Sequence, residues 1–141
     1  MTVTRTATTS WQGDLPSGNG NVAFVSSGIS DTPVSWPARS EEPNGKTSPE
    51  ELIAAAHSAC YSMALSAGLG KAGYTADDIE TQAYVDFKAG TGITGIALNV
   101  RASIPGINAD EFAEIAEATK TGCPVSQALQ SVPITLDAAL R

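Results

Sequence analysis

The sequence has little of the two residue types that most often carry metal or redox chemistry, because it contains only two cysteines and one histidine among 141 residues. Cys60 and Cys123 lie far apart in the chain, so they form neither a C-x-x-C redox motif nor half of a zinc-binding set. A zinc site made from cysteine and histidine would need carboxylates to complete it. We therefore expect no metal and no cofactor.

Positive charge and long apolar runs are also scarce. Eight lysines and arginines stand against fifteen acidic residues, giving a net charge of −7, and no basic stripe is present that could neutralise phosphates. No apolar run approaches the roughly 20 residues that a membrane-spanning helix needs. The N-terminal stretch "MTVTRTATTSWQGD" lacks the apolar core of a secretory signal. These absences argue against nucleic acid and membrane partners and predict a cytoplasmic protein with reduced thiols.

The residues that are present predict a globular chain. Hydrophobic residues make up 42% and charged residues 16%, a typical globular balance, and the length favours a single domain over residues 1–141. Near the N-terminus, β-type residues at 2–11, a turn cluster at 13–20 and the run "NVAFVSSG" predict a hairpin. Residues 31–48 carry several prolines and an Asn-Gly pair, which predicts a long irregular connection.

A long helix should follow this connection. Ser48 suits the N-cap, Pro49 the first helical position and Glu51 the capping-box position, and the helix should end near Gly68 or Gly70. The segment is apolar nearly all round, which predicts that other elements enclose it.

The second half of the chain predicts two further strands, two helices and a last strand. Residues 79–104 contain two alternating runs and read as a second hairpin. Asn108 and Glu111 form another capping box, for a helix that ends at Gly122. Pro124 begins a short helix, and "VPITLDAAL" is the final strand. This order of elements predicts an α+β fold.

Each cysteine allows a structural and a chemical interpretation. Cys123 should stand at a helix start, where free N–H groups lower a thiol pKa, although a plain turn cysteine fits the same position. Cys60 lies about 18 Å from the start of its helix, so that helix end cannot activate it. His57, one turn earlier, could pair with Cys60, but a lone helical histidine is more often a core residue. The residues alone therefore predict an α+β domain with two candidate reactive thiols.

Two longer motifs narrow the choice. The segments "TSPEELIAAAHSACYSMALS" and "KTGCPVSQAL" resemble the signature of the osmotically inducible protein C and organic hydroperoxide resistance (OsmC/Ohr) family of thiol peroxidases, and the similarity extends from "WQGD" to "ITLDAAL". The resemblance implies that Cys60 is the peroxidatic thiol, which becomes a sulfenic acid. It also implies that Cys123 is the resolving thiol, which closes a Cys60–Cys123 disulfide.

The resemblance also implies an arginine and a glutamate beside the peroxidatic thiol. Glu50 matches the family glutamate, although a first-turn carboxylate has a structural explanation as well. One branch of the family places its arginine in the glycine-rich N-terminal turn, which has none here, and the other in the loop before the long helix. Arg39 in that loop indicates the OsmC-type branch. Its guanidinium would favour the thiolate, and Glu50 would orient it.

Helix geometry connects these residues to an expected dimer. Ten residues of helix separate Glu50 from Cys60 by about 15 Å, so one straight helix cannot join them. The family's intertwined homodimer, with antiparallel sheets around a long central helix that carries Cys60, would bring the two together. Alanines, Met63 and Leu65 would then form a dry pocket for an organic peroxide, with Cys60 at its floor.

The function implied by the resemblance is reduction of organic hydroperoxides, and less well of hydrogen peroxide, to alcohols in oxidative or osmotic stress defence. A dithiol, such as a lipoyl group, would be the reductant. A general thiol-disulfide oxidoreductase is one alternative, against which the missing C-x-x-C motif weighs. A non-catalytic binding domain of the same fold is another.

Overall fold

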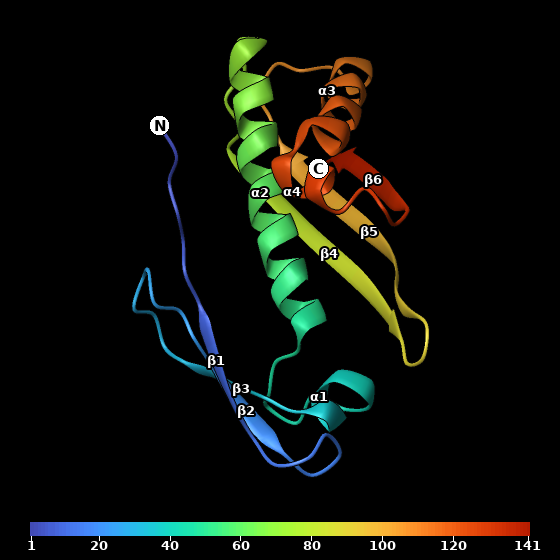
Figure 1. Ribbon diagram of the computed structural model, residues 1–141. Helices are drawn as coiled ribbons and strands as arrows, with labels where there is room; N and C mark the ends of the chain where they lie inside the picture. The colour runs from blue at the N-terminus through green and yellow to red at the C-terminus, as the bar shows by residue number, and fades with distance from the viewer. The chain divides into compact units, whose positions relative to one another are not determined.

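The computed structural model describes all residues from Met1 to Arg141 (Figure 1). The chain forms two compact units, Met1–Leu52 and Ile53–Arg141. Both contain strands and helices, in the order expected for an α+β fold, and this fold class is confirmed. The expectation of one domain over residues 1–141 stays a prediction.

The first unit is built on a three-stranded antiparallel sheet. Its strands β1 (Thr8–Gln12), β2 (Asn19–Ala23) and β3 (Thr32–Val34) lie in the order β1-β2-β3, so the predicted N-terminal hairpin is confirmed. Glycines allow the ring of Trp11 to lie close against the strand opposite, since a Cβ at Gly20 would stand 2.8 Å from a ring carbon. The indole N–H of Trp11 donates to the Gly13 carbonyl at 3.0 Å.

The connection at residues 31–48 is more regular than expected. It contains β3 and a short helix, α1 (Trp36–Ser40), so the interpretation as an irregular loop was wrong. Two of the prolines stand at positions where a missing backbone N–H is tolerated. Pro33 is on an edge strand, and Pro37 is in the first turn of α1. The hydroxyl of Ser35 caps α1 by accepting from the Ala38 N–H at 3.2 Å.

The long helix α2 (Pro49–Lys71) begins and ends as predicted. Its N-terminus is capped by the Ser48 hydroxyl, which accepts from the Glu51 N–H at 3.1 Å. By length and composition the helix could cross a membrane, with a mean hydropathy of 1.3, so the expectation that no apolar run reaches this length was wrong. One such helix is weak evidence for a membrane span, because core helices of water-soluble proteins pass the same test.

Helix α2 is buried on one side only. His57, Tyr61, Leu65 and Leu69 recur at every fourth position and are fully buried, as expected for one helix face. On the other side Ala55, Ala56 and Ala59 are exposed, and Met63 is 74% exposed. The expectation that other elements enclose α2 is therefore wrong for the single chain. The exposed face is apolar, since α2 has no charged residue between Glu51 and Lys71.

The second unit contains a three-stranded sheet of order β4-β5-β6, formed by β4 (Asp78–Lys88), β5 (Gly92–Ser103) and β6 (Ile134–Leu140). Strands β4 and β5 form the predicted antiparallel hairpin. Strand β6 pairs with β5 in parallel, so the expectation of purely antiparallel sheets was wrong here. The chain reaches β6 only after two helices, and such a crossover allows parallel pairing.

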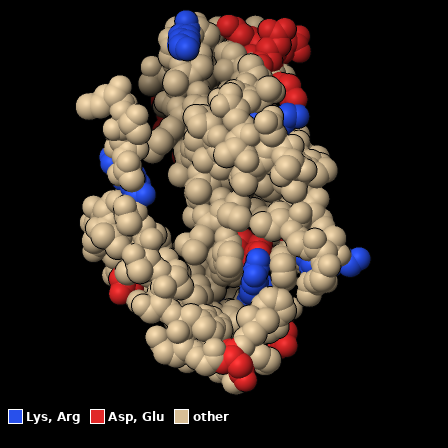
Figure 2. All heavy atoms as spheres, in the orientation of Figure 1, with Lys and Arg blue, Asp and Glu red and all other residues tan.

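Those two helices are α3 (Ala109–Gly122) and α4 (Pro124–Ala128). The Asn108 side chain caps α3 by accepting from the Glu111 N–H at 2.9 Å, as predicted. Together with α2 they pack over the sheet (Figure 1). The core between helices and sheet contains fully buried side chains from three elements: Tyr61, Leu65 and Leu69 of α2, Leu98 and Val100 of β5, and Phe112 of α3. Figure 2 shows acidic side chains gathered over α3.

Candidate active site

The two cysteines lie side by side in the second unit. Cys60 comes from the middle of α2, and Cys123 comes from the junction where α3 ends and α4 begins. Their sulfur atoms are 3.2 Å apart, within hydrogen-bond distance. Cys123 is fully buried, whereas Cys60 is partly exposed. A disulfide with an S–S bond of about 2.05 Å would require the two sulfurs to approach by only about 1 Å.

The surroundings shift the pKa values of the two thiols in opposite directions. Burial raises the pKa of Cys60, and Cys123 raises it further, while the backbone N–H of Val125 acts against both. Burial also acts to raise the pKa of Cys123. The pKa of that thiol is nevertheless lowered, because polar groups of Ser126 and Val125 at the start of α4, together with the Cys60 thiol, favour the thiolate. Within this unit Cys123 is therefore the more acidic thiol.

His57 does not pair with Cys60. Its Nε2 lies 2.7 Å from the Ser126 hydroxyl, and both side chains are buried. Burial lowers the pKa of His57, so the ring is neutral at physiological pH. Its Nδ1 atom is buried and has no hydrogen-bond partner. The histidine thus belongs to the surroundings of Cys123, on the α4 side.

Arg39 and Glu50 are held together in the first unit. Arg39 Nε donates to both carboxylate oxygens of Glu50, at 3.0 and 3.1 Å, and Nη2 donates to Oε1 at 2.8 Å. Glu50 is only 6% exposed, and a carboxylate so deeply buried needs a partner of this kind. Arg39 keeps 32% of its side chain exposed. The planar guanidinium is therefore fixed in orientation while part of the side chain stays exposed.

An apolar hollow of about 210 Å³ adjoins Arg39 in the first unit. Its wall is mostly aromatic and aliphatic, formed by Trp11, Leu15, Val34, Trp36 and Pro49. The expected pocket of Met63 and Leu65 is not formed in this chain, because Leu65 points into the core whereas Met63 is 74% exposed. The apolar surface next to a predicted site residue is thus made by tryptophans that the sequence interpretation did not select.

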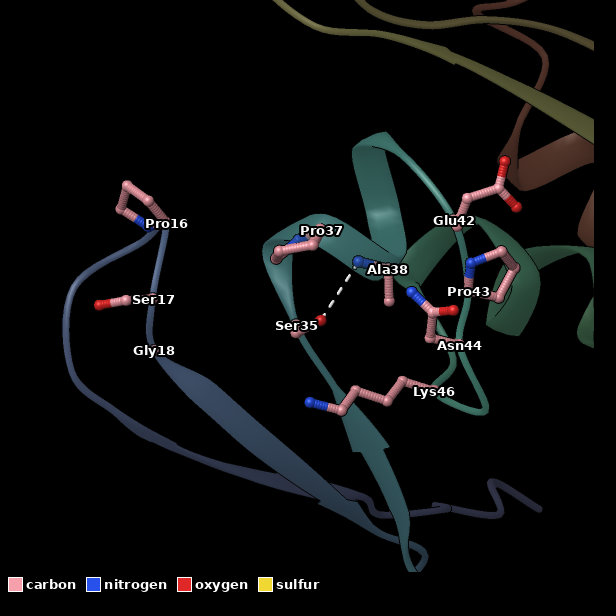
Figure 3. Close-up of a pocket in the computed structure, with 10 residues that line it drawn as sticks. All are labelled: Pro16, Ser17, Gly18, Ser35, Pro37, Ala38, Glu42, Pro43, Asn44 and Lys46. Carbon is pink, nitrogen blue, oxygen red and sulfur yellow. Dashed lines mark hydrogen bonds between the residues drawn. The ribbon is translucent and has the colours of Figure 1, made fainter.

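A second cavity in the first unit, of about 190 Å³, has a more polar wall (Figure 3). It is lined in part by Ser17, Glu42 and Lys46. Figure 3 shows that the Ser35 hydroxyl, also in this wall, is occupied by the cap of α1. The cavity contains neither a thiol nor Arg39, and we assign it no chemistry.

Ser126 was missed by the sequence interpretation. A serine in the first turn of a short helix gives no distinctive signal, and its importance comes from contact with His57, 69 residues earlier in the chain. The two pairs that were predicted are both formed: the structure brings Cys60 to Cys123 and Arg39 to Glu50. Each pair lies in its own unit.

Comparisons with known proteins agree on one family. Residues 42–137 match the family model described as OsmC-like protein. The chain is 44% identical to Peroxiredoxin OsmC of Escherichia coli (strain K12) over 144 residues, covering 100% of this chain and 99% of that protein.

Solved structures show the same fold at lower identity. An OsmC-like protein from Mycoplasma pneumoniae aligns with a TM-score of 0.77 at 14% identity, covering 99% of both chains. The organic hydroperoxide resistance protein OhrB of Bacillus subtilis aligns with a TM-score of 0.71 at 24% identity, covering 95% of this chain and 98% of that one.

Proposed function

The chain is a peroxidase of the OsmC-like protein family, and we propose that it reduces organic hydroperoxides to alcohols through Cys60 and Cys123. The observation that carries this proposal is the 3.2 Å distance between the two sulfur atoms. They are the only cysteines in the chain, and a peroxidase that closes a disulfide within one subunit needs two thiols at such a separation.

The proposed reaction has two oxidative steps. The Cys60 thiolate attacks the terminal peroxide oxygen, the O–O bond breaks, and the alkoxide leaves as the alcohol after taking up a proton. Cys60 is thereby oxidised to a sulfenic acid. The Cys123 thiolate then attacks that sulfur and expels hydroxide, which leaves as water, and a disulfide remains. A dithiol reductant, of which a lipoyl group is one type, reduces the disulfide by thiol exchange.

Arg39 and Glu50 are the groups that we assign to activation of Cys60. A thiol with a raised pKa needs a nearby cation before it ionises at neutral pH, and a guanidinium keeps its charge throughout that range. The N–H groups of the Arg39 guanidinium would also stabilise the negative charge that develops on the leaving alkoxide. Glu50, buried and bonded to Arg39 through three contacts, holds the donor in place.

The hollow beside Arg39 is the place that we propose for the organic part of the substrate. Apolar walls favour a hydrocarbon tail over hydrogen peroxide, which has none. Trp36 lies next to Ser35 at the start of α1 and shares this wall with Arg39. Truncating Trp36 should therefore reduce the preference for cumene hydroperoxide over hydrogen peroxide.

We propose that the working form is a homodimer. Helix α2 is unbroken from Pro49 to Lys71, so Glu50 and Cys60 of one chain remain about 15 Å apart along its axis. The exposed apolar face at Ala55, Ala59 and Met63 would pack against the same face of a second copy, because small residues permit close helix packing. An antiparallel arrangement would bring the Glu50 end of one helix toward Cys60 of the other.

The proposed setting is the cytoplasm, in defence against oxidative or osmotic stress. A general thiol-disulfide oxidoreductase would be oxidised fastest by a protein disulfide, and a binding domain would keep its activity after alkylation of Cys60. Steady-state reduction of cumene hydroperoxide with dihydrolipoamide or with glutathione separates these alternatives. We expect rapid turnover with dihydrolipoamide and none in Cys60→Ser. Substantial turnover by Cys60→Ser would overturn the proposal.

A further inference from the structure

A groove runs between α2 and α3 in the second unit, with a volume of about 380 Å³. Helix α2 contributes Ala64, Ala67, Gly68 and Lys71 to its wall, and α3 contributes a set with the same spacing that ends at Gly122. Residues spaced in this way share one face of a helix, so each wall is a continuous strip. The wall is mainly apolar, and the volume lies in the range of sites that bind small molecules. We call this cavity the α2–α3 groove.

One end of the α2–α3 groove lies beside the two cysteines. Cys60 precedes Ala64 by one helical turn and lies on the same face of α2, and Gly122 directly precedes Cys123. The two sulfur atoms are 3.2 Å apart. Cys123 is fully buried, whereas Cys60 is partly exposed. A molecule in the groove can therefore reach the Cys60 sulfur more readily than the Cys123 sulfur.

The other end of the groove carries a cation. Lys71 is the one charged residue in the wall, its side chain is exposed, and it takes part in none of the ion pairs of the structure. About 10 Å of helix separates it from the thiol end of the groove. Two acidic residues of α3 are engaged elsewhere, since Glu111 accepts from the Tyr74 hydroxyl at 2.7 Å and Glu117 is paired with Lys120.

The two ends of the groove restrict what it can hold. Its middle suits an aliphatic chain, Lys71 suits a carboxylate, and the thiol end suits a group that reacts with a Cys60–Cys123 disulfide. The proposed reaction places the organic part of the peroxide beside Arg39 and gives the reductant no surface. We propose that the α2–α3 groove binds an aliphatic dithiol with a carboxylate end, such as dihydrolipoate, and directs its thiol to the Cys60 sulfur. This assignment rests on the proposed function, in which the disulfide must be reduced in every cycle.

Reduction then proceeds by two thiol exchanges. The first thiolate of the reductant bonds to the Cys60 sulfur, the Cys60–Cys123 bond breaks, and Cys123 leaves as a thiolate that takes up a proton. The second thiolate attacks the reductant's own sulfur in the mixed disulfide and expels Cys60. The reductant closes into a cyclic disulfide and gives up two electrons, so both protein thiols are restored.

Cys123 suits the role of leaving group in the first exchange. Burial acts to raise the pKa of Cys123, but polar groups at the start of α4 and the Cys60 thiol lower it overall. A thiol of lower pKa leaves faster in such an exchange. Burial also shields Cys123 from direct attack, because its side chain is 0% exposed. Access and the nature of the leaving thiol therefore both favour attack at Cys60.

The test follows reduction of a disulfide preformed with diamide, so that its outcome does not depend on the peroxide step. Dihydrolipoate and dihydrolipoamide are compared, because they differ only in a carboxylate against a carboxamide. Lys71→Met should raise the half-saturating concentration of dihydrolipoate about threefold, the effect of losing an exposed ion pair, and leave that of dihydrolipoamide unchanged. Ala118→Leu, in the α3 wall, should raise both about tenfold, because the larger side chain displaces about two methylenes from the groove.

Two matched controls lie outside the groove. Lys88→Met removes an exposed lysine of β4, and Ala113→Leu enlarges an exposed alanine of α3. Both should leave the half-saturating concentrations unchanged. An equal effect of Lys71→Met on the two reductants would overturn the carboxylate contact. Unchanged reduction in Ala118→Leu would overturn the groove as the binding site.

The sulfur that is attacked is identified with ω-sulfanyloctanoate, a thiol of the same chain type that cannot close a ring. Peptide mapping of the trapped mixed disulfide should find this compound on Cys60, with Cys123 free to be alkylated. A mixed disulfide on Cys123 would overturn the direction of attack. Failure of cumene hydroperoxide to produce the Cys60–Cys123 disulfide would instead overturn the proposed function, and reduction of the diamide-formed disulfide would still decide the role of the groove.

Discussion

Oxidation of the two cysteines should stabilise the fold by an amount that the structure allows us to calculate. A Cys60–Cys123 disulfide would close a loop of 63 residues. The loss of chain entropy in the unfolded state then corresponds to about 4 kcal/mol of added stability at 25 °C. The unfolding entropy of about 2.1 cal/mol/K per residue over 141 residues converts this into a rise in Tm of up to about 15 °C.

The native state should accept the bond with little strain. The sulfurs need to move by only about 1 Å from their 3.2 Å separation to the bonded distance, and Cys60 is partly exposed, on a helix with one free face. Strain would reduce the gain, and we expect an observed rise in Tm of about 10 °C. The assay is calorimetry of the protein reduced with dithiothreitol and of the protein oxidised with one equivalent of cumene hydroperoxide.

The control is Cys123→Ser, which cannot form the bond and should show no comparable rise after the same treatment. Protein concentration is held constant, because Tm depends on concentration if the chain dimerises. Peptide mapping verifies that the disulfide lies within one chain. An unchanged or lower Tm in protein with the verified disulfide would mean that the α2 and α3–α4 segments must distort to form it. In that case the 3.2 Å separation would not represent a pair prepared for disulfide closure.

Three further outcomes are expected from the proposed site and dimer. Arg39→Met should slow the peroxide step by about 10²-fold or more, and Arg39→Lys should be nearly as slow because an ammonium lacks the planar fork. Near-normal rates in stopped-flow assays of either variant would contradict the role of Arg39. Met63→Glu places a charge on the exposed face of α2 and should dissociate the dimer in analytical ultracentrifugation, and an unaffected dimer would show that this face is not the interface. Mixing inactive Cys60→Ser and Glu50→Ala chains should restore activity in heterodimers, because one site would contain both an intact Cys60 and an intact Glu50; verified heterodimers without activity would exclude a shared site.

Elements with local signals could be predicted from the sequence. The start of α2 follows from the chemistry of its own cap, in which Ser48 and Glu51 interact across one turn. The cap of α3 at Asn108 is local in the same way. Both helices were therefore predicted, as was the β4–β5 hairpin, whose strands alternate about a short turn.

Features that depend on distant partners could not be predicted in this way. Strand β3 has only three residues and exists because it pairs with β2, so its proline resembled a loop signal. The direction of β6 depends on the path through α3 and α4. Burial of Leu65 and exposure of Met63 cannot be told apart from an apolar sequence without knowing what packs on each face of α2.

The same limit applies to the candidate site. Cys60, Cys123 and Glu50 were identified through two motifs that resemble a family, and Arg39 through its place in the loop before the long helix. The structure pairs them as thiol with thiol and cation with carboxylate. Ser126 lies within the second motif but was assigned no role there, and the tryptophans beside Arg39 were not selected as site residues. Their significance depends on which atoms the fold brings close to a thiol or to a guanidinium.

The opposite pKa shifts of the two thiols indicate what each step of the proposed reaction requires. Burial and the neighbouring Cys123 raise the pKa of Cys60, whereas the pKa of Cys123 is lowered. The surroundings therefore favour ionisation of Cys123, the resolving thiol, and disfavour ionisation of Cys60, the attacking thiol. Attack on a peroxide needs a thiolate at Cys60, and a cation close to that sulfur would reverse the shift. Helix α2 contains no lysine or arginine before Lys71, so the cation must come from another element. Arg39, fixed on Glu50, is the one we expect. Because about 15 Å of helix keeps Glu50 from Cys60 in its own chain, the Arg39–Glu50 pair of a second copy is its expected source. Dimerisation would then activate the attacking thiol, whereas the resolving thiol would be prepared in every chain.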